Sequence, residues 1–239
     1  MKYRRNIQDE SVKTDLVSFC LCALLFFSPS LYSQEQKENV FSLKTGLGLS
    51  GTQIHGDNYS GFDKAGIYGG AVVSARMNKR LSLDLGFIFT QKGSRHNQNP
   101  VKNDYSYYYV NLNYIEMPLI ANYLLNKDYF VSGGPSIAYL ASYTEQTERG
   151  DWTGVYPFET YEYGINVGLG KRIKEKFIFE VRSSNSISPI RSYGVLASTV
   201  FYPNAVAQFF NKGLYNNVLT FILSYQFKFK SRQNEPVQN

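Results

Sequence analysis

Long apolar runs are missing from this chain of 239 residues. No stretch reaches the roughly eighteen apolar residues that a membrane-spanning helix needs, and the mean hydropathy is −0.30. The only histidines are His55 and His96, and the only cysteines are Cys20 and Cys22. A metal site or a histidine-based catalytic centre therefore has very few side chains to draw on.

The N-terminal segment 1–33 reads as a secretory signal peptide. A positively charged start is followed by an apolar stretch, Leu16–Phe27, which is too short to span a membrane, and Ser33 offers a cleavage point. Both cysteines lie within this segment, so its removal leaves a chain without thiols, which suits an oxidising envelope compartment. An uncleaved N-terminal anchor helix is the alternative.

Aromatic residues are abundant, with 20 Tyr and 17 Phe, and the 19 Gly outnumber the 8 Pro. After residue 40, apolar and polar residues alternate in long segments, and strict alternation predicts strands with one apolar face. Leu81, Leu83, Leu85, Phe87 and Phe89, for example, share one face. The predicted strands lie at about residues 40–54, 67–77, 81–90, 107–125, 129–143, 161–170, 177–184 and 215–229.

The connections between these segments alternate between long and short. Short turns follow the second, fourth and sixth strands; long polar loops follow the others, with 93–105 one of them and a short helix expected at 204–211. Bacterial outer-membrane barrels have an even strand number and this asymmetry of connections. We therefore expect an all-β fold: an eight-stranded antiparallel up-and-down transmembrane β-barrel (34–230) after the signal peptide, with a polar tail at 231–239.

The polar faces decide which side of the barrel faces outward. A lipocalin-like soluble barrel would put the apolar face inside, whereas a membrane barrel puts it outside. Here the polar faces combine glycine with charges of both signs, which suits the crowded lumen of a small barrel, where buried charges must be paired. The predicted lumenal charge network, structural in role, consists of Lys44, Arg76, Asp84, Glu116, Glu180 and Arg182, with Glu162 on the same faces.

The segment 107–125 is the most unusual strand. Its apolar residues occupy even positions up to Tyr114 and odd positions from Ile115, which predicts a β-bulge between these two residues. Glu116 is expected to pair across the lumen with Arg76 or Arg182. The alternative is that Glu116 faces lumenal water.

Several of these segments together resemble the PorT-type outer-membrane β-barrel family, also called porin-family. They are the signal peptide, the eight strands, Tyr114–Tyr123 (with Asn122 where the family has Lys), the glycine-rich Tyr163–Gly170 and the aromatic last strand. The resemblance covers residues 35–230. It implies an outer-membrane barrel, and its founding members are linked to a protein-secretion system of type IX.

No catalytic, cofactor-binding or metal site is predicted. Both histidines fall in loops, the pairing of His55 with Asp57 is weak, and no basic run interleaved with aromatics indicates nucleic-acid binding. The aromatic loops could bind a partner or fold over the barrel mouth; their residues are Trp152, Tyr156, Phe158, Tyr202, Phe209 and Phe210.

The sequence thus predicts a non-enzymatic protein in the outer membrane of a Gram-negative-type cell, with its lumen plugged by side chains. Its expected partners are the lipid bilayer, the barrel-assembly machinery and an envelope or secretion-system protein. A structural or partner-binding role is the first hypothesis, and a narrow channel or carrier for small or apolar solutes is the alternative. A lipid-modifying enzyme is disfavoured because Ser and His are not placed together.

Overall fold

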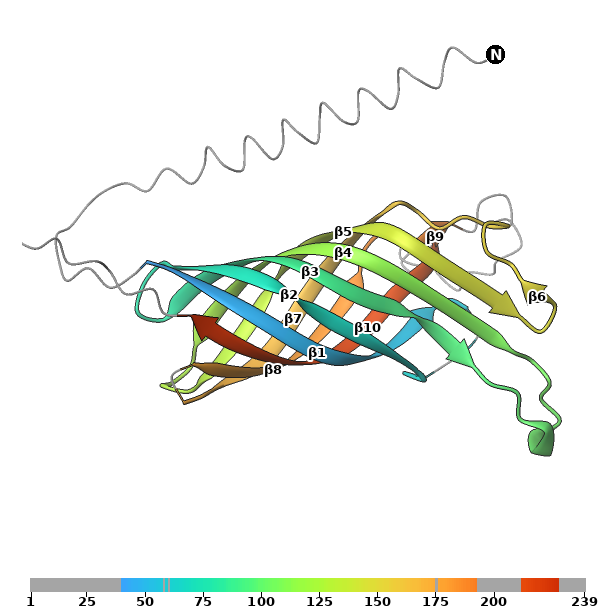
Figure 1. Ribbon diagram of the computed structural model, residues 1–239, viewed down its shortest axis with the longest axis horizontal. Helices are drawn as coiled ribbons and strands as arrows, with labels where there is room; N and C mark the ends of the chain where they lie inside the picture. Colours follow the sequence, from blue (N-terminus) through green and yellow to red (C-terminus); the bar gives the residue numbers. More distant parts are fainter. Residues whose placement is uncertain (1–39, 58, 60, 175, 193–211, 228–239) are drawn as a thin grey trace, which may run out of the picture. The chain divides into compact units, whose positions relative to one another are not determined.

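The computed structural model describes residues 40–57, 59, 61–174, 176–192 and 212–227. These residues form one antiparallel sheet in which each long strand pairs with the next and β1 pairs with β10 (Figure 1). The expected eight-stranded up-and-down barrel is therefore confirmed. Its eight long strands are β1 (Phe41–His55), β2 (Lys64–Arg76), β3 (Leu81–His96), β4 (Tyr108–Leu124), β5 (Tyr129–Thr147), β7 (Tyr161–Ile173), β8 (Phe177–Ser186) and β10 (Gly213–Phe227).

Three short elements lie at one end of the barrel. β6 (Gly150–Asp151) pairs with β5, β9 (Arg191–Ser192) pairs with β10, and a single 3-10 turn, η1 (Pro100–Lys102), lies between β3 and β4. β3 runs to His96, so the loop predicted at 93–105 begins later than expected. The expected signal peptide (1–33), the helix at 204–211 and the tail (231–239) lie outside the described residues.

The connections alternate as predicted between short turns at one end and longer loops at the other. Asn78 and Asn126 each begin a short turn. Their side-chain oxygens accept hydrogen bonds of 2.8–3.0 Å from the backbone N–H groups two and three residues later. These bonds fix the turn, as asparagine commonly does. We call this the short-turn end and the opposite one the long-loop end.

An apolar belt surrounds the middle of the barrel on its outside. Leu47 is 76% exposed and Leu169 is 64% exposed, while their inward-facing neighbours are polar residues or glycine. An outside of this kind suits hydrocarbon, where a strand is stable only if every backbone group is paired, as barrel closure allows. The belt includes Leu47, Leu49, Ile67, Leu85, Phe87, Met117, Leu119, Ile165, Val167, Leu169, Phe221 and Leu223.

A ring of polar side chains replaces the belt toward the long-loop end. The strand register places Gln91 opposite Asn113 and Asn113 opposite Ser142. Gln91 Nε2 donates to Asn113 Oδ1 at 3.0 Å, and Asn113 Nδ2 donates to Ser142 Oγ at 3.0 Å. This polar ring, defined as Gln53, Gln91, Asn113, Ser142, Asn185 and Asn217, marks where the outside of the barrel changes from apolar to polar on six of the eight long strands.

Beyond the polar ring the apolar side chains of β4 face inward. Val110, Leu112 and Tyr114 are completely buried, whereas Asn111 and Asn113 face outward. The change of apolar phase in this strand therefore comes from a change of surroundings. Apolar residues face outward within the belt and inward beyond the ring, where they form a core.

The β-bulge predicted between Tyr114 and Ile115 is consequently wrong. β4 keeps its even-numbered residues inward throughout, and its register with β3 does not shift. The irregularity lies in the neighbouring strand, since Asn113 pairs with Ser142 and Tyr114 pairs with Leu140. The extra residue is thus Ala141 of β5, which reverses the facing of every later side chain in that strand.

Candidate functional site

Ion pairs inside the barrel begin near the short-turn end. Lys44 Nζ of β1 lies 2.7 Å from Asp84 Oδ2 of β3, and both side chains are nearly buried. β2 separates the two strands in the sheet, so this pair bridges across its inner face. The pair therefore ties together two strands that share no backbone hydrogen bonds.

A second ion pair lies on β8. The Arg182 guanidinium donates through Nε and Nη2 to both carboxylate oxygens of Glu180, at 2.9 Å each. Ser132 Oγ also donates to Glu180 at 2.7 Å, and Arg182 Nη1 donates to the Tyr68 hydroxyl at 3.4 Å. Such two-point arginine–carboxylate contacts are among the strongest hydrogen-bonded pairs and leave few polar atoms unsatisfied.

A third cluster crosses the lumen. Lys92 Nζ of β3 lies 3.1 Å from Glu116 of β4 and 2.8 Å from Glu162 of β7, and all three side chains are buried. Asn216 of β10 donates through Nδ2 to the second oxygen of Glu162 at 2.7 Å. Four strands are thereby joined by one buried ammonium group and its acceptors.

A small cavity lies among the lumenal side chains near the short-turn end. The cavity around Lys44, Tyr68, Asp84 and Arg182 has a volume of about 30 Å³. That volume holds about one or two water molecules.

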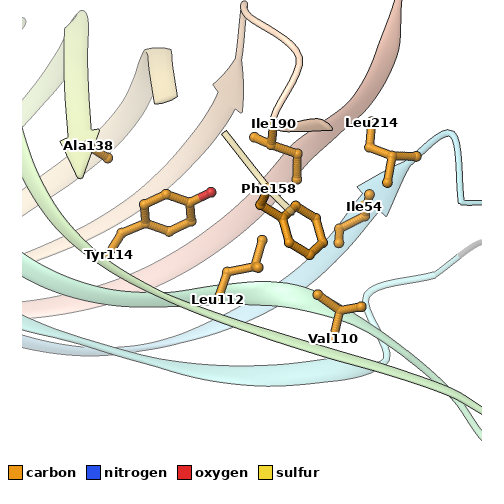
Figure 2. Close-up of a cluster of buried hydrophobic side chains, with 8 residues drawn as sticks. All are labelled: Ile54, Val110, Leu112, Tyr114, Ala138, Phe158, Ile190 and Leu214. Carbon is orange, nitrogen blue, oxygen red and sulfur yellow. The ribbon is translucent and has the colours of Figure 1, made fainter. Parts of the chain in front are cut away.

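A hydrophobic cluster fills the barrel beyond the polar ring (Figure 2). Val110, Leu112 and Tyr114 project from β4 toward Phe158 and Ile190, which lie in the long connections. The remaining members are Ile54, Ala138 and Leu214. All eight are at most 8% exposed, so they form a buried apolar layer inside this part of the barrel.

A buried ion pair holds two of the long connections against the barrel wall. Arg191 donates to both oxygens of Glu145, at 2.9 Å and 2.5 Å, and to the backbone oxygen of Tyr156 at 2.5 Å. Its guanidinium lies 3.7 Å from the ring centroid of Phe158. We call this group the mouth clamp, defined as Arg191, Glu145, Phe158 and the carbonyl of Tyr156.

A smaller polar group lies in the connection between β3 and β4. Asp104 Oδ2 lies 2.8 Å from His96 Nε2, and Asp104 Oδ1 accepts from the Ser106 hydroxyl. Hydrogen bonds from Ser106, together with that from His96, lower the pKa of Asp104 to about 2. The carboxylate thus binds the hydroxyl and the imidazole separately, so the histidine is not placed to take a proton from the serine. Tyr59 stacks on the His96 ring at a centroid distance of 4.5 Å.

The structure brings most of the predicted charge network into the lumen. The side chains of Lys44, Asp84, Glu180 and Arg182 lie there as two ion pairs. The predicted partner of Glu116 is corrected, because Glu116 pairs with Lys92 rather than with Arg76 or Arg182. Arg76 ends β2 with its side chain exposed at the short-turn end, too far along the barrel axis to reach Glu116.

Lys92 is the main lumenal residue that sequence reasoning missed. The inward positions of β3 are even-numbered, beginning at Asp84, and Lys92 continues the same series. Ending the strand at Thr90 concealed this. The pair of His96 and Asp104 was also missed, because nothing in their sequence spacing indicates that the loop folds back on itself.

The described part of the chain offers neither a metal-binding cluster nor a membrane-spanning helix. Within it, no group of three or more His, Cys, Asp or Glu residues is arranged to hold a metal ion. No helix among the same residues is long and apolar enough to cross a membrane.

The chain resembles solved outer-membrane proteins at low identity. Ail, the attachment invasion locus protein of Yersinia pestis, is 10% identical, with 78% of this chain and 98% of that chain covered and a TM-score of 0.45. Neisserial surface protein A is 9% identical (81% and 100% covered, TM-score 0.42), and CarO of Acinetobacter baumannii is 9% identical (76% and 97% covered, TM-score 0.41). No curated protein matches the chain in sequence.

Structural similarities at such low sequence identity do not assign the chain to a family. The assignment rests on a family model instead. The model of the outer membrane protein beta-barrel domain matches residues 32–192, well over half of the chain. The match extends from before β1 to the end of β9, and therefore covers seven of the eight long strands. The chain therefore belongs to the outer membrane protein beta-barrel domain family, as an integral barrel of the outer membrane whose apolar belt contacts the lipid bilayer.

Proposed function

We propose that this protein is a non-conducting barrel with a structural or partner-binding role. The observation that carries the proposal is the filling of the lumen by three ion-pair clusters and one hydrophobic cluster. A hydrated ion entering from either side would have to displace Lys92 from its two carboxylates and separate the packed side chains around Leu112. Both steps are costly, because each exposes buried charge or opens a dry core.

The long-loop end is the partner-binding surface in this proposal. The mouth clamp fixes the connection that contains Val155 and Tyr156, two side chains that are more than half exposed. Trp152 lies beside Tyr156, with ring centroids 6.0 Å apart. Rigid, exposed aromatic residues supply contact area with little loss of conformational entropy on binding.

No enzymatic activity is proposed. Ser106 and His96 both bind Asp104, so this group lacks the hydrogen bond from nucleophile to base that acyl transfer requires. The buried Lys92 cluster lies between the ion pair of Arg182 and the hydrophobic cluster, where a substrate has no route to it.

The resemblance to the PorT-type family suggests the nature of the partner. In that reading the partner is an envelope protein of a secretion system, and the barrel-assembly machinery acts only while the barrel is inserted. Affinity capture from membranes of the native cell tests this link. The variant Val155→Ser with Tyr156→Ser should lose the captured protein, whereas Val101→Ser with Tyr105→Ser, which alters exposed residues of another loop, should retain it.

Conductance in planar bilayers tests the non-conducting barrel. We expect no current steps above background from the purified, folded protein, while an open porin inserted in the same way gives steps. Heat-dependent gel migration of the same sample verifies that the barrel is folded. Reproducible open steps would replace the proposal with the narrow channel or carrier.

A further inference from the structure

Positive charge is concentrated at the short-turn end of the barrel. All three short turns carry lysine or arginine, and only Asp128 and Glu175 oppose them. The basic residues are Arg76, Lys79, Arg80, Lys127, Lys171, Arg172, Lys174 and Lys176, and every one except Arg172 has an exposed side chain. We call this set the basic collar.

The long-loop end has a different balance of charge. Its exposed cations, such as Arg95, Lys102 and Arg149, are interspersed with acidic residues. The acidic residues of this end include Asp57, Asp63, Asp104, Glu148, Asp151 and Glu159. The positive charge of the described barrel is thus distributed unevenly along its axis.

Aromatic residues place the basic collar at the level of lipid headgroups. Tyr129, Phe177 and Phe227 are exposed on the outside of the barrel where the apolar belt ends at the short turns. Aromatic girdles of this kind mark the membrane interface of outer-membrane barrels. Lys171 Nζ lies 5.0 Å from the ring centroid of Tyr129, so at least one collar cation sits directly on the girdle.

An apolar groove on the outer wall leads to the same level. It has a volume of about 400 Å³ and lies across β8, β10 and β1, lined mainly by Thr45, Leu47, Phe177, Leu223 and Tyr225. Phe177 directly follows Lys176 of the basic collar. A molecule with an acyl chain in the groove would therefore have its headgroup beside a lysine.

We propose that the basic collar binds anionic phospholipids in the leaflet that faces the short turns, with one acyl chain seated in the groove. In outer-membrane barrels the short turns are periplasmic. Each lysine or arginine near an anionic lipid surface adds favourable electrostatic energy. The groove and the basic collar together match a molecule that has an apolar tail and an anionic headgroup. A soluble acidic protein has no such tail.

Lipid retention tests this proposal. The full-length folded protein is reconstituted in vesicles of equal phosphatidylcholine and phosphatidylglycerol, extracted in mild detergent, and analysed for retained lipid by mass spectrometry. We expect about five-fold enrichment of phosphatidylglycerol, which corresponds to the effect of one basic residue near an anionic surface. The enrichment should fall as salt is raised, because screening shortens the reach of exposed charges.

Two matched triple variants locate the effect. The collar variant Lys79→Gln, Lys127→Gln, Lys176→Gln removes one charge from each short turn, including the lysine beside the groove, and we expect its enrichment to fall toward one. The variant Arg95→Gln, Lys102→Gln, Arg149→Gln removes the same charge from the long-loop end and should enrich like the wild type. Equal retention of both lipids by the wild type, or equal loss in the two variants, would overturn the proposal. The proposal would also be overturned if the collar variant kept its lipid enrichment but lost a co-purifying acidic protein.

Discussion

Lys92 holds two carboxylates that come from different strands of the barrel wall. Glu116 and Glu162 lie within 3.1 Å of its ammonium group, and both glutamates are buried. Removal of one member of such a buried group leaves the others without compensation, which costs far more than the group contributes when complete.

Replacing Lys92 with methionine should therefore destabilise the barrel strongly. Lys92→Met keeps most of the length of the side chain and removes its charge, and we expect the free energy of unfolding to fall by about 3–5 kcal/mol. Urea unfolding in lipid vesicles, followed by the fluorescence of Trp152, the single tryptophan, measures this change. Lys102→Met, at an exposed position in η1, is the control and should change little.

A compensated variant checks the electrostatic cause. Lys92→Met combined with Glu116→Gln and Glu162→Gln leaves no buried charge in the cluster, so it should recover a large part of the lost stability. If the triple variant is no more stable than Lys92→Met, the loss comes from packing and the electrostatic account of this cluster is wrong.

Asp104 links the order of its loop to pH. Its pKa falls from 3.8 to about 2, because Ser106 and His96 make hydrogen bonds to the charged carboxylate. A lowered folded-state pKa means that this stabilisation is fully present above the unfolded pKa and is lost as the pH falls through the folded pKa. The loop 97–107 should therefore loosen between pH values of about 4 and about 2.

Pepsin cleavage measures the loosening, since the protease works across this pH range. The ratio of cleavage rates in Asp104→Asn and in the wild type should be well above one near pH 4 and approach one below pH 2, where the wild-type carboxylate is also mostly protonated. A ratio that stays constant across the range would show that the ionised carboxylate does not order the loop.

At the scale of the strand, β4 keeps the same inward–outward alternation of its side chains along its whole length, but it passes through two different environments. From Glu116 to Asn122 its inward residues are mostly polar or proline and its outward ones apolar; from Val110 to Tyr114 the inward residues are apolar and the outward ones are asparagine. On β4 this change falls at Asn113, where we expect the hydrocarbon to end.

Cysteine labelling locates this boundary. In a Cys20→Ser, Cys22→Ser background, Asn113→Cys should react with a water-soluble maleimide added outside intact cells, whereas Met117→Cys should not, because lipid covers it. The two positions share one face of one strand, so they differ only in depth. Equal labelling of both would move the boundary below Met117.

Alternation alone was sufficient to predict the eight strands and the inward placement of Lys44, Asp84, Glu180 and Arg182, because the side-chain period of a strand is independent of its neighbours. The ion-pair partner of each lumenal side chain could not be predicted, since it depends on the stagger between distant strands. The mouth clamp was hidden for a further reason. Ala141 reverses the facing of Glu145, so simple alternation along β5 places this residue outside.

At the scale of the whole molecule, closure depends on the seam between β1 and β10. A Cβ atom at Gly48 would lie 2.5 Å from the backbone oxygen of Phe221 on β10, a contact that only movement of the backbone can relieve. At Gly133 the nearest atom to an added Cβ is 3.5 Å away, which is an ordinary contact. The two glycines therefore form a matched pair for testing closure.

Closed membrane barrels usually migrate differently on a denaturing gel before and after boiling. We expect the wild type and Gly133→Val to show this heat-dependent shift. Gly48→Val should lose a substantial share of the fast-migrating form, as densitometry of unboiled samples would show. If Gly48→Val migrated like the wild type, the seam would tolerate the added atoms. The packing between β1 and β10 would then be less tight than the structure indicates.

The reversal of apolar facing at the polar ring has a consequence for the order of assembly. The belt gains stability from hydrocarbon and so can form as the strands enter the membrane, whereas the cluster around Leu112 gains stability by excluding water. That cluster includes Phe158 and Ile190, which belong to connections that must first be carried across the bilayer. We therefore expect this buried apolar layer to be the last part of the molecule to form, after the loops have crossed the bilayer.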